Sequence, residues 1–80
     1  NYVRGDFMRA CINVIALDQN GERFDFTKYV FNVFNKTESQ FISFIENNAS
    51  DFAEEACHDE APNLDFVAIS GIEFDNEDEQ

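Results

Sequence analysis

The chain has 80 residues, 44% of them hydrophobic, and a formal net charge of −12 at pH 7. This length allows a single small domain whose core supplies only a few kcal/mol of net stability. The charge argues against direct binding to nucleic acid, whose phosphates need Lys and Arg, and against binding to anionic membranes. No run approaches the roughly 18 apolar residues of a membrane span.

The two signs of charge are separated along the chain. The first 36 residues contain four acids and all five basic residues, which are Arg4, Arg9, Arg23, Lys28 and Lys36. Residues 37–80 contain 13 acids and no Lys or Arg. Because like charges repel and weaken a folded state, surfaces usually mix the two signs. A half of one sign therefore indicates a partner of opposite charge, and we expect a basic protein surface that itself evolved to hold nucleic acid.

Cysteine usage indicates the compartment. Cys11 and Cys57 have no metal-binding or redox spacing, and two cysteines are too few for a disulfide scaffold. We expect buried free thiols, because free Cys behaves as a small hydrophobe, and hence a reducing, cytoplasmic environment. A Cys11–Cys57 bridge is the alternative. The chain starts at Asn1, so the sequence leaves open an upstream targeting segment.

The first elements are a predicted hairpin. Residues 7–17 alternate with a period of two, and one face of this strand carries Met8, Ala10, Ile12, Val14 and Ala16. Asn20-Gly21 is a strong hairpin-turn signal. A second strand should cover residues 22–34. Its apolar phase changes between Phe24 and Phe26 on one face and Tyr29, Phe31 and Val33 on the other, so we expect a bulge near Thr27-Lys28.

A helix follows. Thr37 and Gln40 form a capping-box pattern, and Glu38 favours the positive end of a helix dipole. At about 100° per residue one broad apolar side contains Phe41, Phe44, Ile45, Ala49, Phe52 and Ala56. Ser50 is able to cap a second, shorter helix after a kink, and the helical segment must end before Pro62.

Residues 64–74 form the third predicted strand. Leu64, Phe66, Ala68, Ile72 and Phe74 should share one face, opposite Asp65, Val67, Ile69 and Glu73, with a bend at Gly71. Residues 75–80 contain no apolar side chain, which predicts a flexible acidic tail. The order β-β-α-β within one domain, 1–80, predicts an α+β two-layer sandwich of a three-stranded antiparallel sheet and one amphipathic helix. The order of the strands in the sheet stays open.

No pattern indicates an enzyme, a cofactor or a metal. Adjacent helical residues such as Cys57 and His58 point about 100° apart, which is poor geometry for a nucleophile and its base, so His58 should face solvent. The isolated glycines form no phosphate-binding loop. Residues 18–21 only partly match a calcium loop, because Ala16 stands where the first Asp belongs.

Three short sequence motifs indicate a third class of protein, a secreted adhesion domain or a glycosylated domain. Residues 4–6 match the integrin-binding tripeptide Arg-Gly-Asp, and residues 35–37 and 48–50 match the glycosylation sequon. Such matches are frequent by chance.

The acidic residues form two groups. One follows the end of the predicted helix and consists of Asp51, Glu54, Glu55, Asp59 and Glu60. The other, at the end of the last strand and beyond it, consists of Glu73, Asp75, Glu77, Asp78 and Glu79. Helical positions three or four apart hold their Cβ atoms about 5–6 Å apart, which is of the same order as the spacing of phosphates along a strand. Such a row can replace a nucleic-acid backbone, although solvated helix faces are the more frequent role of acidic rows.

In charge and element order the chain resembles small acidic phage-encoded inhibitors, including anti-CRISPR and other DNA-mimic proteins. The features that resemble them are the strand at 9–17, the turn at 20–21, the helix at 37–55 and the acidic end at 75–79. Acidic immunity proteins that block basic nuclease toxins share the same physics. The resemblance implies a non-enzymatic inhibitor that occupies a basic, nucleic-acid-binding groove. The phase of the second strand separately suggests Phe24 or Tyr29 as an exposed aromatic anchor. The alternative is an assembly module whose open edge strand pairs with a second copy into a homodimer, while the acids only solubilise it.

Overall fold

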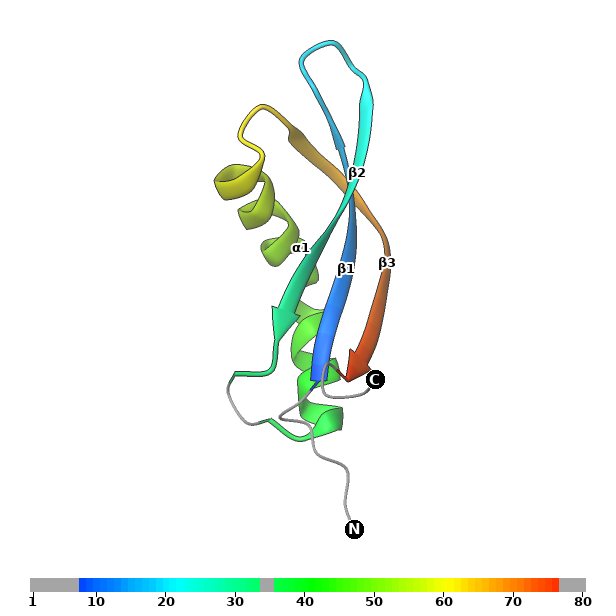
Figure 1. The fold of residues 1–80 in the computed structure, drawn as a ribbon, viewed down its shortest axis with the longest axis vertical. Coiled ribbons are helices and arrows are strands. Elements are labelled where there is room, and N and C mark those ends of the chain that lie inside the picture. The colour runs from blue at the N-terminus through cyan, green and yellow to red at the C-terminus, as the bar shows by residue number, and fades with distance from the viewer. Residues whose placement is uncertain (1–7, 34–35, 77–80) are drawn as a thin grey trace.

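The computed structural model describes residues 8–33 and 36–76. They form β1 (Met8–Leu17), β2 (Arg23–Phe31), α1 (Glu38–Glu60) and β3 (Asp65–Asn76). The three strands make one antiparallel sheet in the order β2-β1-β3, and α1 packs on one face of it (Figure 1). This confirms the α+β sandwich with the order β-β-α-β, and it places β3 beside β1.

The central strand supplies the sheet side of the core. Residues at alternate positions of β1 are at most 6% exposed, namely Met8, Ala10, Ile12, Val14 and Ala16. Their neighbours on the other face are half-buried. The period-two pattern therefore identified the core face of β1 correctly, and the rest of the hydrophobic core packs against this face.

A short loop joins β1 to β2. The Asp18 amide donates to the Glu22 carbonyl at 3.0 Å, which closes a loop of residues 19–21, and Gly21 has a φ of +80°. One carboxylate oxygen of Asp18 accepts from the Asn20 and Glu22 amides at 2.8 Å each. A residue with positive φ at the end of a three-residue hairpin loop is the usual place for glycine.

The predicted bulge in β2 is wrong. Residues of β1 and β2 pair without interruption from Arg9 opposite Phe31 to Leu17 opposite Arg23. The strand keeps its regular alternation, so the change of apolar phase leaves Tyr29 and Phe31 on the sheet face that α1 does not cover, 48% and 41% exposed. β2 also ends at Phe31 rather than at residue 34, which lies outside the described residues.

The irregularities lie in β3 instead. Its pairing with β1 shifts between Asn13 and Val14 and again between Ile15 and Ala16, because β3 has one extra residue at each point. As a result Ile69 opposes Val14 on the core face, and Ala68 opposes Ile15 on the other. Our prediction had placed these two residues the other way round, since a strict period of two cannot pass a bulge.

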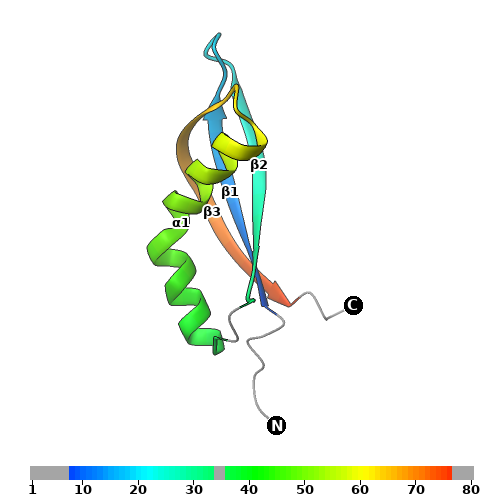
Figure 2. The same ribbon diagram turned by 90° about the vertical axis from the view of Figure 1, so that its left-hand side faces the viewer.

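The helix starts and ends where the sequence predicted, without the optional break at Ser50. Thr37 is the N-cap, its hydroxyl accepts from the Gln40 amide at 3.3 Å, and the Gln40 side chain accepts from the Thr37 amide at 3.2 Å. α1 then continues for 23 residues through Ser50, so no second helix begins there. Its axis curves (Figure 2), and the Asn48 side chain donates to the Phe44 carbonyl at 2.8 Å, a contact with the helix backbone that favours bending. The helix ends at Glu60, before Pro62.

The core between helix and sheet is made of one large ring and several small side chains. The buried side of α1 consists of Phe41, Ile45, Ala49, Ala53, Ala56 and Cys57. Phe41 is fully buried and packs edge to face on Phe74, with 6.1 Å between the ring centroids. We had also placed Phe44 and Phe52 on the apolar side. Both are half-buried, and they pack on each other with 5.8 Å between the ring centroids. Among the described residues no helix has the length and apolarity of a membrane span.

Candidate partner-binding surface

The five acids predicted on the helix are exposed, but they do not all share one side of it, because Glu60 turns to Lys28, which opposes Ile12 on the core face. These acids, called here the helix acids, are Asp51, Glu54, Glu55, Asp59 and Glu60. Positions 51, 55 and 59 follow one another at a helix rise of about 6 Å. Four of these acids, together with His58, border one hollow of about 560 Å³. The helix therefore presents a row of carboxylates to solvent.

Three of these carboxylates have no counter-ion within the described part of the chain. Glu60 pairs with the Lys28 ammonium at 3.1 Å, and Asp59 contacts Nδ1 of His58 at 2.9 Å. Asp51, Glu54 and Glu55 form no ion pair among the described residues. These three carboxylates are the ones that remain available to a partner's cations.

The acids of β3 do not join this surface. Glu73 opposes Cys11 and Asp75 opposes Arg9, so both lie on the sheet face turned away from α1. β3 also continues through Asp75 and Asn76, two residues past the expected start of the acidic tail. Glu77 lies outside the described residues. Of the two acidic groups named from the sequence, the sheet thus separates Glu73 and Asp75 from the helix acids.

Asp75 is occupied by an internal contact. The guanidinium of Arg9 donates to both carboxylate oxygens of Asp75, at 3.0 and 2.7 Å. This hydrogen bonding lowers the pKa of Asp75 below its ordinary value and raises the pKa of Arg9 further. The same guanidinium lies 4.8 Å from the centroid of the Tyr29 ring. Arg9 is therefore held by a carboxylate and a ring at once.

The two suggested aromatic anchors are exposed, but they lie on different faces. Phe24 is 43% exposed and opposes Ala16 of the core face, whereas Tyr29 opposes Cys11 of the uncovered face. Only one of them could share a contact surface with a given set of acids.

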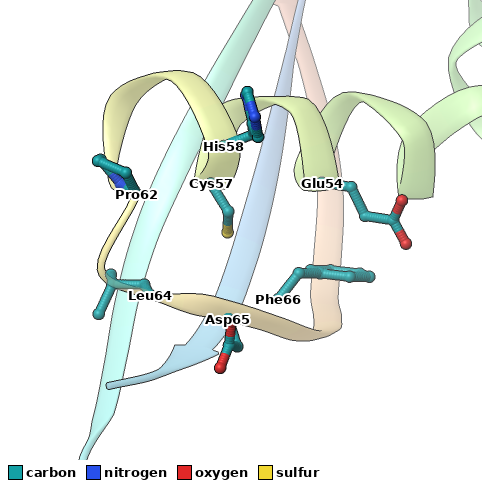
Figure 3. A pocket seen from close by; sticks show the side chains of 7 residues that line it. All are labelled: Glu54, Cys57, His58, Pro62, Leu64, Asp65 and Phe66. Carbon is teal, nitrogen blue, oxygen red and sulfur yellow. The ribbon is translucent and has the colours of Figure 1, made fainter. Parts of the chain in front are cut away.

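A second hollow adjoins the helix acids. It measures about 710 Å³ and lies between the end of α1 and the start of β3, with Glu54, Pro62, Leu64 and Phe66 around Cys57 (Figure 3). This is called here the α1–β3 groove. Sequence reasoning missed it. The short connection after Glu60 folds the start of β3 back under the helix, and only the alternation of Leu64 and Phe66 directly after Pro62 pointed to apolar side chains at this place.

Both cysteines are free, and the fold keeps them apart. Cys57 is buried on the core side, while Cys11 is half-buried on the uncovered sheet face. Burial, followed by the charges of Asp65 and Glu54, raises the pKa of the Cys57 thiol. Burial is also the main cause that raises the pKa of Cys11. Both groups are therefore held as neutral thiols rather than as reactive thiolates.

His58 and the short motifs occupy separate places in the chain. The His58 side chain is 88% exposed, as expected for a solvent-facing histidine, and it contacts Asp59. No cluster of three His, Cys, Asp or Glu side chains in the described residues could hold a metal ion. Asn48 of the second sequon lies inside α1 with its amide bonded to Phe44, and both the tripeptide at 4–6 and the Asn of the first sequon fall outside the described residues.

Comparison with family models, with curated proteins and with solved structures found no match to the chain. The function therefore has to be argued from the surface itself.

Proposed function

We propose that the protein is a non-enzymatic binding module that occupies a basic, nucleic-acid-binding surface of a larger protein in the cytoplasm. It would act as an inhibitor in the manner of the small phage-encoded DNA mimics that it resembles. The observation that carries this proposal is the row of helix acids, of which Asp51, Glu54 and Glu55 have no counter-ion among the described residues.

Electrostatics explains what such a row would do. Exposed carboxylates on one rigid helix attract a basic groove over about 8–10 Å at physiological ionic strength. They would fix the orientation of the two proteins as they meet. They would also raise the association rate more than they would lower the dissociation rate. A helix keeps its charges at fixed spacing, so the row costs less ordering entropy on binding than a disordered acidic tail would.

The edges of the sheet weigh against the alternative, a homodimer formed by edge-strand pairing. Lys28 of the edge strand β2 opposes Ile12 on the core side and reaches Glu60, so this edge carries an inward-pointing charge. β3, the other edge, contains two irregularities in its pairing. Inward charges and bulges are the devices by which proteins prevent edge-to-edge association.

Charge reversal tests the proposal. Cellular proteins that bind heparin resin are first collected. They are then passed at low salt over the immobilised 80-residue protein, and the amount captured is measured. Reversal of Asp51, Glu54 and Glu55 to Lys should reduce capture by about tenfold or more, because the steering charges change sign. The matched control, Glu22, Glu46 and Glu73 to Lys, makes the same change in net charge at exposed positions outside the helix acids. It should retain capture within about twofold.

Equal losses in both triple variants would mean that net charge alone is responsible, and the proposed site would be wrong. Salt-insensitive self-association of the wild type, with no capture, would favour the homodimer.

A further inference from the structure

The α1–β3 groove combines apolar walls with the carboxylate of Glu54, and His58 and Asp65 also line it. Pro62, Leu64 and Phe66 supply the apolar side, and Cys57 at the base is 3% exposed. Figure 3 shows the Glu54 carboxylate and the Phe66 ring at the same end of the groove, and the Asp65 side chain pointing away from the helix. Glu54 also borders the hollow of the helix acids, so the groove and the row are continuous.

An occupant must match both properties of the groove. An apolar side chain would fill the walls but would bury the charge of Glu54 without a counter-ion, which is unfavourable. A cation on a long apolar stem satisfies both, because Lys and Arg bury their methylene groups and keep the charge at the end.

A contact within the protein shows whether Lys or Arg is better suited to a ring beside a carboxylate. Arg9 lies over the Tyr29 ring at 4.8 Å while it donates two hydrogen bonds to Asp75. Phe66 and Glu54 offer the same pair of groups, and no cation pairs with Glu54 in the described part of the chain. The planar guanidinium stacks on rings and binds carboxylates through two donors, whereas the ammonium of Lys is a strongly hydrated point charge.

We propose that the α1–β3 groove receives an arginine side chain of the basic partner. This inference rests on the proposed function, since it names the residue type by which the partner would be anchored beside the helix acids. The row of acids would then give attraction, and the groove would select arginine.

The test is an NMR titration of the full 80-residue chain with three blocked tripeptides, acetyl-Gly-X-Gly-amide, in which X is arginine, lysine or norleucine. The arginine peptide should shift the amide signals of Cys57, Leu64 and Phe66, and bind about fivefold more tightly than the lysine peptide. Glu54→Gln should weaken it by about fivefold or more, and its matched control Glu46→Gln should not. Phe66→Leu should remove the preference for arginine over lysine while Glu54 still attracts both.

Equal binding of the norleucine peptide would assign the groove to an apolar occupant and overturn the proposal. So would signal shifts confined to Asp51 and Glu55, or the absence of binding. If any of these occurs while reversal of the helix acids still abolishes capture, the groove inference fails and the proposed function stands. Arginine-selective binding of the peptide in the groove, with capture unaffected by a reversal that includes Glu54, would show that the groove binds arginine but does not anchor the captured partner. It would contradict both the proposed function and the anchoring role of the groove.

Discussion

Arg9 shows how a single residue can decide the character of a surface. On the uncovered sheet face it neutralises Asp75 and covers part of the exposed Tyr29 ring. This side of the sheet is therefore less acidic and less apolar than its sequence suggests. The contrast with Asp51, Glu54 and Glu55 is the reason that we place the partner on the helix and not on β3.

The Arg9–Asp75 pair gives a prediction about pH. Hydrogen bonding from Arg9 lowers the pKa of Asp75 in the folded state below its ordinary value of 3.8. The stabilisation is therefore complete above that ordinary value and is lost as the pH falls through the lowered pKa. Arg9→Gln should destabilise the protein at about pH 6, and its difference from wild type should shrink as the pH falls from about 4 towards 2.

Urea denaturation at a series of pH values measures this difference. In an Asp75→Asn background the effect of Arg9→Gln should not vary with pH, because the titrating partner is gone. A pH-dependent effect that persists in that background would assign the dependence to another group.

The two phenylalanines of the first helical turns should differ in their contribution to stability. Phe41 is fully buried against Phe74, whereas Phe44 is half-buried. Phe41→Ala should cost about 3–5 kcal/mol of unfolding free energy, which is a large part of the stability of a small domain. Phe44→Ala should cost clearly less, and Phe24→Ala, at an exposed position, least. Denaturation midpoints at constant m-value provide the comparison, and equal costs at positions 41 and 44 would show that the core is assigned wrongly.

At the scale of the elements, the start of α1 depends on a reciprocal pair of hydrogen bonds between Thr37 and Gln40. Thr37→Ala should therefore lower the unfolding free energy by about 1 kcal/mol, within a usual range of about 0.5–2. Ser43→Ala is the control, because it removes an exposed hydroxyl from the helix interior and should be neutral or slightly stabilising. Thermal unfolding monitored by circular dichroism distinguishes them. The same shift in both variants would mean that the cap does not stabilise the helix.

The elements with strong local signals were predictable from the sequence. The alternation from Met8 to Ala16 and the Thr37–Gln40 capping box determine local backbone geometry through neighbouring residues. The bulges in β3 have no comparable local signal. Ile69 faces the core only because β1 pairs with β3 past an extra residue, so its orientation depends on a strand more than 50 residues away in the sequence.

The candidate site was half predictable for a similar reason. Asp51, Glu55 and Asp59 follow one another at spacings of four residues on one helix, so the helical period alone places them side by side. The relation of Glu73 and Asp75 to that helix depends on which side of the sheet each strand position faces, and on the order β2-β1-β3. The alternation of residues 64–74 already placed Glu73 opposite the apolar face, but the strand order is not encoded locally, and the α1–β3 groove, which joins two elements, was missed for the same reason.

Taken as a whole molecule, the protein has two unlike sides. α1 covers one face of the sheet (Figure 2), and its acids are exposed. The other face carries Tyr29, Phe31 and the paired Arg9. Net charge on one side favours orientation of the molecule before contact. A basic groove would therefore meet the helix side first.

The most direct measurement of the central claim is competition for the partner. The partner captured through the helix acids is titrated with labelled wild-type protein in the presence of rising concentrations of the nucleic acid that the partner binds. If the helix acids take the place of phosphates, the two ligands exclude each other, and the apparent Kd of the protein rises in proportion to the nucleic-acid concentration. Simultaneous binding of both, with no loss of affinity for either, would contradict the claim.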